Sequence, residues 1–195
     1  MSDPLILEAP PETGVTFPPE RLDEEAEEIE RLLIAVLLLF IIGKLSKALT
    51  RKRGMAIIDK HFKAIFAEVN AHYKKQGLAT PTLKTKAIKD VKTLIVAEFE
   101  KMLSAEDYWK TEKGVRQSTM MLAMLITYAV AAAVAVSVAR KIPDAVLVWM
   151  TKEDPDVCII CEGFKGEYDP HDPNLPIIPP HPNGRCWWII IFGEG

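Results

Sequence analysis

Three cysteines and one histidine near the end of the chain have the residue types and spacing of a metal site. Cys158 and Cys161 form a Cys-x-x-Cys pair, in which a tight turn can direct both sulfurs at one ion. His181 and Cys186 follow as a His-x4-Cys pair and complete a Cys3His set. This set suits tetrahedral Zn²⁺, and four protein ligands leave no position open for water. The sequence therefore predicts a structural zinc site rather than a catalytic one.

Other interpretations of these thiols stay open at the level of sequence. The cysteines could be small buried side chains of a β module that holds no metal. A redox pair is disfavoured because the Cys-x-x-Cys lacks the strand and helix of a thioredoxin-like unit. His171 is an alternative ligand, although its Asp- and Pro-rich surroundings are typical of a solvated loop. Because the cysteine count is odd and confined to one end, a disulfide framework is disfavoured and a reducing compartment is indicated.

A series of short motifs surrounds the four predicted ligands. A strand with Trp and Thr precedes an Asp and the Cys-x-x-Cys pair, and a Gly-containing loop leads to Pro-Pro, His-Pro and Arg-Cys. These elements are Trp149, Thr151, Asp156, Cys158, Cys161, Gly163 or Gly166, Pro179-Pro180, His181-Pro182 and Arg185-Cys186. In this combination the segment resembles the phage head morphogenesis family, the minor head proteins related to phage Mu protein F. Gly184 departs from the family pattern, which often has a cysteine there.

The resemblance implies a structural virion protein of a tailed phage, without enzymatic activity. Such a minor capsid protein is present in few copies at the portal vertex and acts in head assembly, DNA packaging or ejection. Its expected partners are the portal protein, the major capsid protein or both, and it is expected to be oligomeric in the virion. The expected location is the virion, after assembly in the host cytoplasm.

Charge and proline divide the chain into three segments that must position this site. Residues 1–30 hold ten acids and one base, residues 31–150 hold twenty bases and nine acids, and residues 151–195 hold three bases and eight acids. Thirteen of the fourteen prolines lie at or before position 19 or from position 143 onward. We therefore predict an extended arm over residues 1–22, a helical body over residues 23–142 and a Cys/His β module over residues 143–195. The N-terminus lacks the pattern of a secretory signal.

Apolar residues recur at helical spacing through the middle segment and predict about four helices. The first begins at Asp23, the second spans residues 52–76 and ends before Gly77, and the third spans residues 83–103. The fourth begins at 105 or 111 and ends at 140. The predicted fold class is mainly α: a helical body with an extended N-terminal arm and a small zinc-knuckle-like β module (α+β).

The last segment has the composition of short strands around a turn-rich loop. Residues 146–150 and 187–192 are rich in β-branched and aromatic side chains. Trp187 and Trp188 are adjacent, so on a strand they must point to opposite faces. We expect one of them in the core.

Two apolar stretches, residues 32–42 and residues 120–139, have the composition of buried or membrane helices. The first is shorter than the roughly 20 residues of a bilayer span, and we expect it to be buried between neighbouring helices. The second is long enough, but its alanines favour a central helix packed in protein. A membrane-interacting ejection protein with two apolar helices is the alternative function.

A basic cluster follows the first apolar stretch. Its members are Lys44, Lys47, Arg51, Lys52, Arg53, Lys60 and Lys63, opposed only by Asp59. It could contact DNA phosphates without sequence specificity, an acidic portal surface or a membrane surface, or it could be a solvated helix face.

A metal-dependent nuclease is a second alternative function. Its candidate residues are His171, Asp172, His181 and Asn183, whose loop spacing is not diagnostic. The chain has no Ser-His-Asp set, no phosphate-binding Gly loop and no His-Glu-x-x-His motif. These absences favour a protein that does not catalyse a reaction.

Overall fold

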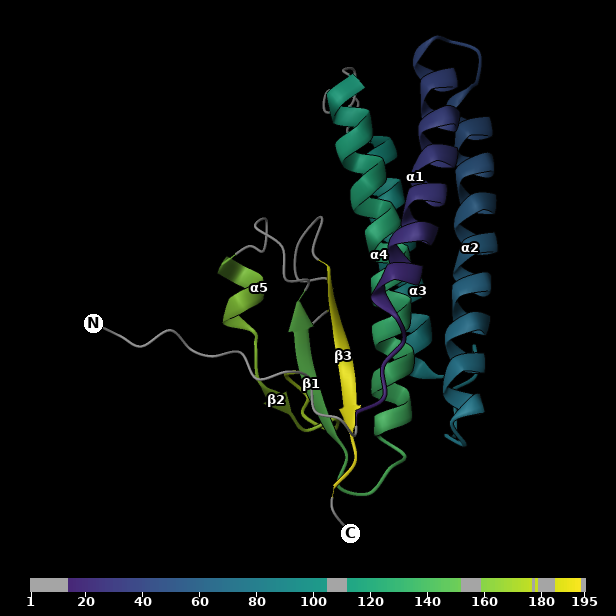
Figure 1. The fold of residues 1–195 in the computed structure, drawn as a ribbon. Coiled ribbons are helices and arrows are strands. Elements are labelled where there is room, and N and C mark those ends of the chain that lie inside the picture. The colour runs from purple at the N-terminus through teal and green to yellow at the C-terminus, as the bar shows by residue number, and fades with distance from the viewer. Residues whose placement is uncertain (1–13, 105–111, 152–158, 177, 179–184, 194–195) are drawn as a thin grey trace, which may run out of the picture.

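A computed structural model describes residues 14–104, 112–151, 159–176, 178 and 185–193. Four long helices form a bundle, and a three-stranded antiparallel sheet with a short helix lies beside it (Figure 1). The predicted mainly helical fold class with a small C-terminal β module is confirmed. One hydrophobic cluster includes buried residues from both the bundle and the sheet.

Helix α1 spans Pro19–Ile41 and buries one stripe of residues against the bundle. The stripe consists of Leu22, Ala26, Ile29, Leu33 and Leu37. The helix begins four residues before the predicted Asp23, because Pro19 occupies the first helical position, where a missing N–H group is tolerated. Residues 19–22, which we assigned to the extended arm, are therefore helical.

The expectation that the whole stretch 32–42 is buried was wrong. Leu33 and Leu37 are buried, but the end of the helix leaves large apolar side chains in solvent. These side chains are Leu38, Leu39, Ile41 and Ile42. The reason is geometric: the other helices cover only one side of α1, so an apolar residue elsewhere on its circumference has no neighbour.

Helix α2 spans Lys47–Lys75 and α3 spans Lys86–Ser104. The predicted stop at Gly77 is confirmed: its φ is 75°, and its N–H donates to the carbonyl of Lys74. The next N–H, of Leu78, donates to the carbonyl of Tyr73, which completes a Schellman motif.

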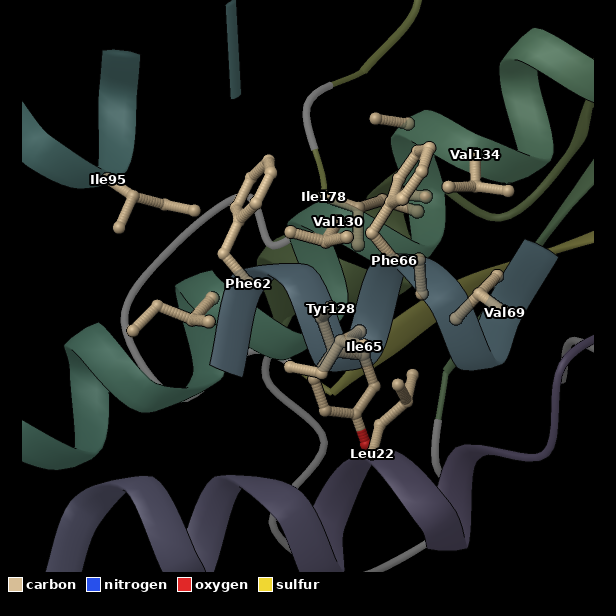
Figure 2. Packing of buried hydrophobic residues seen from close by; sticks show 14 of the residues in the cluster. Leu22, Phe62, Ile65, Phe66, Val69, Ile95, Tyr128, Val130, Val134 and Ile178 are labelled. Atoms are coloured by element: carbon tan, nitrogen blue, oxygen red, sulfur yellow. The ribbon is translucent and has the colours of Figure 1, made fainter. Parts of the chain in front are cut away.

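Helix α4 spans Glu112–Ala139 and contacts α1, α2, α3 and the sheet. Its segment Lys113–Ala139 is long and apolar enough to cross a membrane, yet 72% of its most apolar window is buried inside the protein. Figure 2 shows Tyr128, Val130 and Val134 of this helix packed with residues of α2 and α1. The helix is therefore a central element of the bundle, as its alanine content predicted.

The sheet has the strand order β2-β1-β3, with β1 at Val146–Thr151, β2 at Glu167–Tyr168 and β3 at Cys186–Ile191. Both strands predicted from composition are confirmed: β1 is longer by one residue, Thr151, and β3 begins and ends one residue earlier than predicted. The sequence did not predict β2 or the short helix α5 at Ile159–Gly163. Of the adjacent tryptophans, Trp188 is buried and Trp187 is half-buried, as their opposite directions require.

The segment before α1 covers the outer edge of β3. Val15 exchanges two 2.9 Å backbone hydrogen bonds with Ile190, and the Thr16 hydroxyl donates to the carbonyl of Trp188 at 3.0 Å. Phe17 is buried beside the ring of His72 in α2. This segment therefore connects the sheet to the bundle.

Candidate metal centre

Two of the four predicted ligands meet in the core of the β module. The Sγ atoms of Cys161 and Cys186 lie 3.1 Å apart, and these residues are 4% and 0% exposed. Cys161 lies on α5 and Cys186 is the first residue of β3. The other two predicted ligands, Cys158 and His181, lie outside the described residues.

The register of the sheet explains why Cys186 faces α5. Antiparallel pairing of β1 with β3 places Thr151 opposite Cys186 and Trp149 opposite Trp188. Because side chains alternate along a strand, these residues share one face of the sheet. Cys161 and Phe164 contact this face from α5 and the turn that follows it. In Figure 1 the strands lie between α5 on one side and α4 on the other.

An aromatic cluster packs on the same face as the cysteines. The Trp149 ring lies 5.2 Å from the ring of Trp188, edge to face, and 5.2 Å from the ring of Phe164. Tyr168 of β2 packs edge-on against Trp188, and its hydroxyl donates a 2.7 Å hydrogen bond to the carbonyl of Phe164. The cluster covers the same face on which both cysteines are buried.

Sequence analysis missed Phe164 and Tyr168 as members of the site. The signal that could have found them is their position: each follows the Cys-x-x-Cys pair within a few residues, on either side of Gly166. Gly166 supplies the backbone conformation of the turn, with a φ of 158°, and its carbonyl accepts from the N–H of Trp149.

Two buried polar atoms belong to residues on the same face of the sheet as Cys186. Thr151 Oγ1 and Trp149 Nε1 are both buried and have no hydrogen-bond partner within the part of the chain that the structure describes. Both are potential donors, and donors beside a thiolate stabilise its negative charge.

The geometry of the cysteine pair is compatible with one metal ion. Two thiolates bound to Zn²⁺ at about 2.3 Å with tetrahedral angles lie about 3.8 Å apart. The observed 3.1 Å reaches that value after small rotations of the two side chains. Within the described residues no group of three or more His, Cys, Asp or Glu side chains surrounds a common point. The structure thus brings together two of the four predicted ligands.

The residues of the alternative nuclease site are placed only in part. His171 is exposed in a turn where its N–H donates to Asp169, and Asp172 accepts from the N–H of Asn174. Both His181 and Asn183 lie outside the described residues. His171 lines an open cleft of 790 Å³ with Arg140, Lys141 and Asp144. The Arg140 Nε group donates a hydrogen bond to the carbonyl of Pro170. One of the basic side chains of the cleft therefore has a structural role in holding the turn that contains Pro170.

The basic cluster lies on the turn after α1 and on the exposed face of α2. Lys44, Lys47, Arg51, Lys52, Arg53, Lys60 and Lys63 are all exposed. Arg51 pairs with Glu100 of α3, and Lys63 pairs with Asp59 at 2.5 Å. The cluster therefore presents a positive surface at the α1–α2 end of the bundle, next to the exposed apolar side chains of α1.

Comparisons of the chain with protein-family models, with curated proteins and with solved structures found no match to any of them.

Proposed function

We propose that this chain is a structural virion protein of a tailed phage, a minor head protein that binds at the portal vertex. The observation that supports the proposal most directly is the meeting of Cys161 and Cys186 beside Trp149 and Trp188. Cys161, Cys186, Trp149 and Thr151 are among the residues that carry the family resemblance, and they form one buried face of one module. The proposed role is binding and assembly, without catalysis.

We further propose that Cys158, Cys161, His181 and Cys186 hold Zn²⁺ in a structural site. When bound, the ion would link α5, the segment before β3 and β3 itself by four protein ligands. The small size of the module favours such a link, because a three-stranded sheet with a two-residue strand buries little apolar surface of its own. The module would then present a fixed surface to the portal.

The experiment that tests the virion role is quantitative mass spectrometry of purified virions of the phage that encodes the chain. The expected result is that the chain is present in far fewer copies than the major capsid protein and that it coelutes with portal rings when the two are coexpressed. A folded chain that is absent from virions and binds neither the portal nor the major capsid protein would overturn the proposal.

A matched pair of variants connects portal binding to the cysteine module. The double variant Cys161→Ser, Cys186→Ser removes the two thiols of the buried pair. The control Leu83→Ser changes an exposed side chain that is far from the strands in the sequence. We expect the double variant to lose coelution with the portal while its helical circular dichroism persists, and Leu83→Ser to retain coelution. Equal binding by both variants would show that the module is not the portal-binding element.

A further inference from the structure

Exposed apolar side chains are concentrated at one end of the bundle. Within the described residues eight large apolar side chains are exposed, and five of them lie between positions 38 and 49. These five are Leu38, Leu39, Ile41, Ile42 and Leu49. Ile42, at the end of α1, is 62% exposed. We call these five residues the apolar tip; it lies at the α1–α2 turn, at the end of the bundle away from the C-terminus of α4 (Figure 1).

The turn that carries the apolar tip is an ordered structure rather than a frayed helix end. Gly43 has a φ of 71°, its N–H donates to the carbonyl of Phe40, and the Lys44 N–H donates to the carbonyl of Leu39. These bonds form a Schellman motif. Ser46 then caps α2 by accepting from the Leu49 N–H at 3.3 Å. The turn thus holds these apolar side chains exposed to water in a defined arrangement. This exposure does not stabilise the folded chain.

The charged residues of the turn and of the first two turns of α2 are all basic. No acid occurs between Arg31 and Ile58, whereas Lys44, Lys47, Arg51, Lys52 and Arg53 lie in and just after the turn. Several of them are near the N-terminus of α2, where the helix dipole disfavours cations. Arg51 already has an anionic partner in Glu100 of α3. An external anionic partner would offset the cost for the exposed cations Lys44, Lys52 and Arg53.

We propose that the apolar tip and its flanking cations bind the surface of an anionic lipid bilayer. Residues 38, 39, 41 and 42 point into an arc of about 160° on one side of the helix, since each residue turns the chain by about 100°. They form one exposed apolar face beside the cations of the turn. DNA would pair with the cations and leave the apolar side chains in water. Interfacial binding satisfies both groups, because apolar side chains enter the acyl boundary while cations meet lipid phosphates.

This proposal does not depend on the proposed virion role, and it differs from a bilayer span. Helix α4 stays in the core of the bundle, and only the end of the α1–α2 hairpin meets lipid. The contact would be peripheral and reversible, since a few side chains and several cations act together.

The test is flotation of the full chain with vesicles of stated composition. The probes are phosphatidylcholine vesicles and vesicles that contain about 30% phosphatidylglycerol, with NaCl at about 0.1 M and about 0.5 M. We expect binding to the anionic vesicles to exceed binding to neutral ones by about tenfold or more, and to fall at least about fivefold at high salt.

Three variants separate the two parts of the proposal. Leu39→Ser with Ile42→Ser removes apolar area at the tip, and Lys44→Gln with Arg53→Gln removes two exposed cations. We expect each double variant to bind the anionic vesicles about tenfold more weakly than the parent. Leu83→Ser is the matched control, because Leu83 is 45% exposed but lies at the turn before α3. Its binding should equal that of the parent.

Three results would overturn the proposal. The first is the absence of binding to anionic vesicles by a folded parent chain. The second is equal binding by the Leu39→Ser, Ile42→Ser variant, which would assign the attraction to charge alone. The third is a dimer of the parent chain in sedimentation that the Leu39→Ser, Ile42→Ser variant abolishes while its vesicle binding stays unchanged. That result would show that a second copy of the chain covers the tip.

Discussion

Tyr128 of α4 donates a 2.8 Å hydrogen bond to the carboxylate of Asp23 in α1, which is 105 residues earlier in the chain. Tyr128 is 1% exposed, and Figure 2 shows its hydroxyl directed toward α1 beside Leu22. Burial, and then the hydrogen bond to Asp23, raise the pKa of Tyr128 far above its usual 10, so the hydroxyl acts as the donor at neutral pH.

Replacement of this tyrosine by phenylalanine removes the donor and nothing else. We expect Tyr128→Phe to lower the free energy of unfolding by about 1–2 kcal/mol, because a buried donor to a charged acceptor is lost. Urea denaturation measures the change. The control Asp23→Asn retains an acceptor oxygen at the same place and should lose less. A Tyr128→Phe variant as stable as the parent would show that the bond contributes nothing.

Gly54 of α2 is required by the packing of α3. A Cβ atom at position 54 would come 2.1 Å from Cζ of Phe99, which is fully buried. In an exposed helix Gly→Ala is favourable by roughly 1 kcal/mol, so the intrinsic propensity predicts stabilisation. We expect the opposite for Gly54→Ala, a loss of about 1–3 kcal/mol from overpacking, measured by urea denaturation.

A second substitution distinguishes overpacking from other effects of Gly54→Ala. Phe99→Leu shortens the side chain that the new methyl group meets, so the double variant should be more stable than the sum of the two single changes predicts. Additive losses would contradict the steric explanation.

Asp59 makes stability depend on pH through two lysines. Hydrogen bonds from Lys63 and then Lys92 hold the pKa of Asp59 below its usual 3.8. The stabilisation is therefore present above that value and lost as the pH falls through 3.8 toward the lower pKa of the folded state. Because the carboxylate is 39% exposed, we expect Asp59→Asn to lower the free energy of unfolding by less than about 1 kcal/mol.

Denaturation at about pH 7 and about pH 3 tests this dependence, since the difference between Asp59→Asn and the parent should shrink at the lower pH. Asp90→Asn, which removes one exposed pair with Lys86, is the control and should change stability less. A difference that persists unchanged at low pH would rule out the two lysine contacts as its cause.

Removal of zinc should destabilise the cysteine module if our assignment of the ligands is right. We expect a strong chelator to release about one equivalent of zinc and to lower Tm by about 5 °C or more. Elemental analysis and calorimetry measure the two effects. Cys161→Ser with Cys186→Ser should contain no zinc and be insensitive to the chelator. A folded parent with less than about half an equivalent of zinc would contradict the assignment, because a structural site stays filled.

The helices and the two long strands could be predicted because their patterns are local. The helical spacing of apolar residues over 52–76 and the stop at Gly77 can be seen in the sequence, and both are confirmed. Short elements have no period: α5 has five residues and β2 has two, so neither could be recognised. Their positions depend on contacts with β1 and β3, which are distant in sequence.

Spacing predicted that Cys161 and Cys186 belong to one site, and the structure brings these two together. Spacing could not predict which other residues share the face of the sheet with Cys186. Thr151 and Trp149 lie on that face because of the register between β1 and β3. The apolar composition of residues 32–42 likewise could not show that other helices pack against only one side of α1. The positions of Cys158 and His181 relative to the pair stay predictions.

The hydrogen bond from Thr16 to Trp188 joins residues 172 positions apart. At roughly 5–20 residues per second, a ribosome needs roughly 10–35 s to make the second partner after the first. In the last part of that time, after β1 and α4 are made, β1 has no β3 beside it and the face of α4 that β3 covers is bare. Of the three strands of the sheet, β3 is synthesised last and completes the cover of α4, so synthesis interrupted before β3 would yield chains with exposed apolar surface that chaperones and proteases recognise.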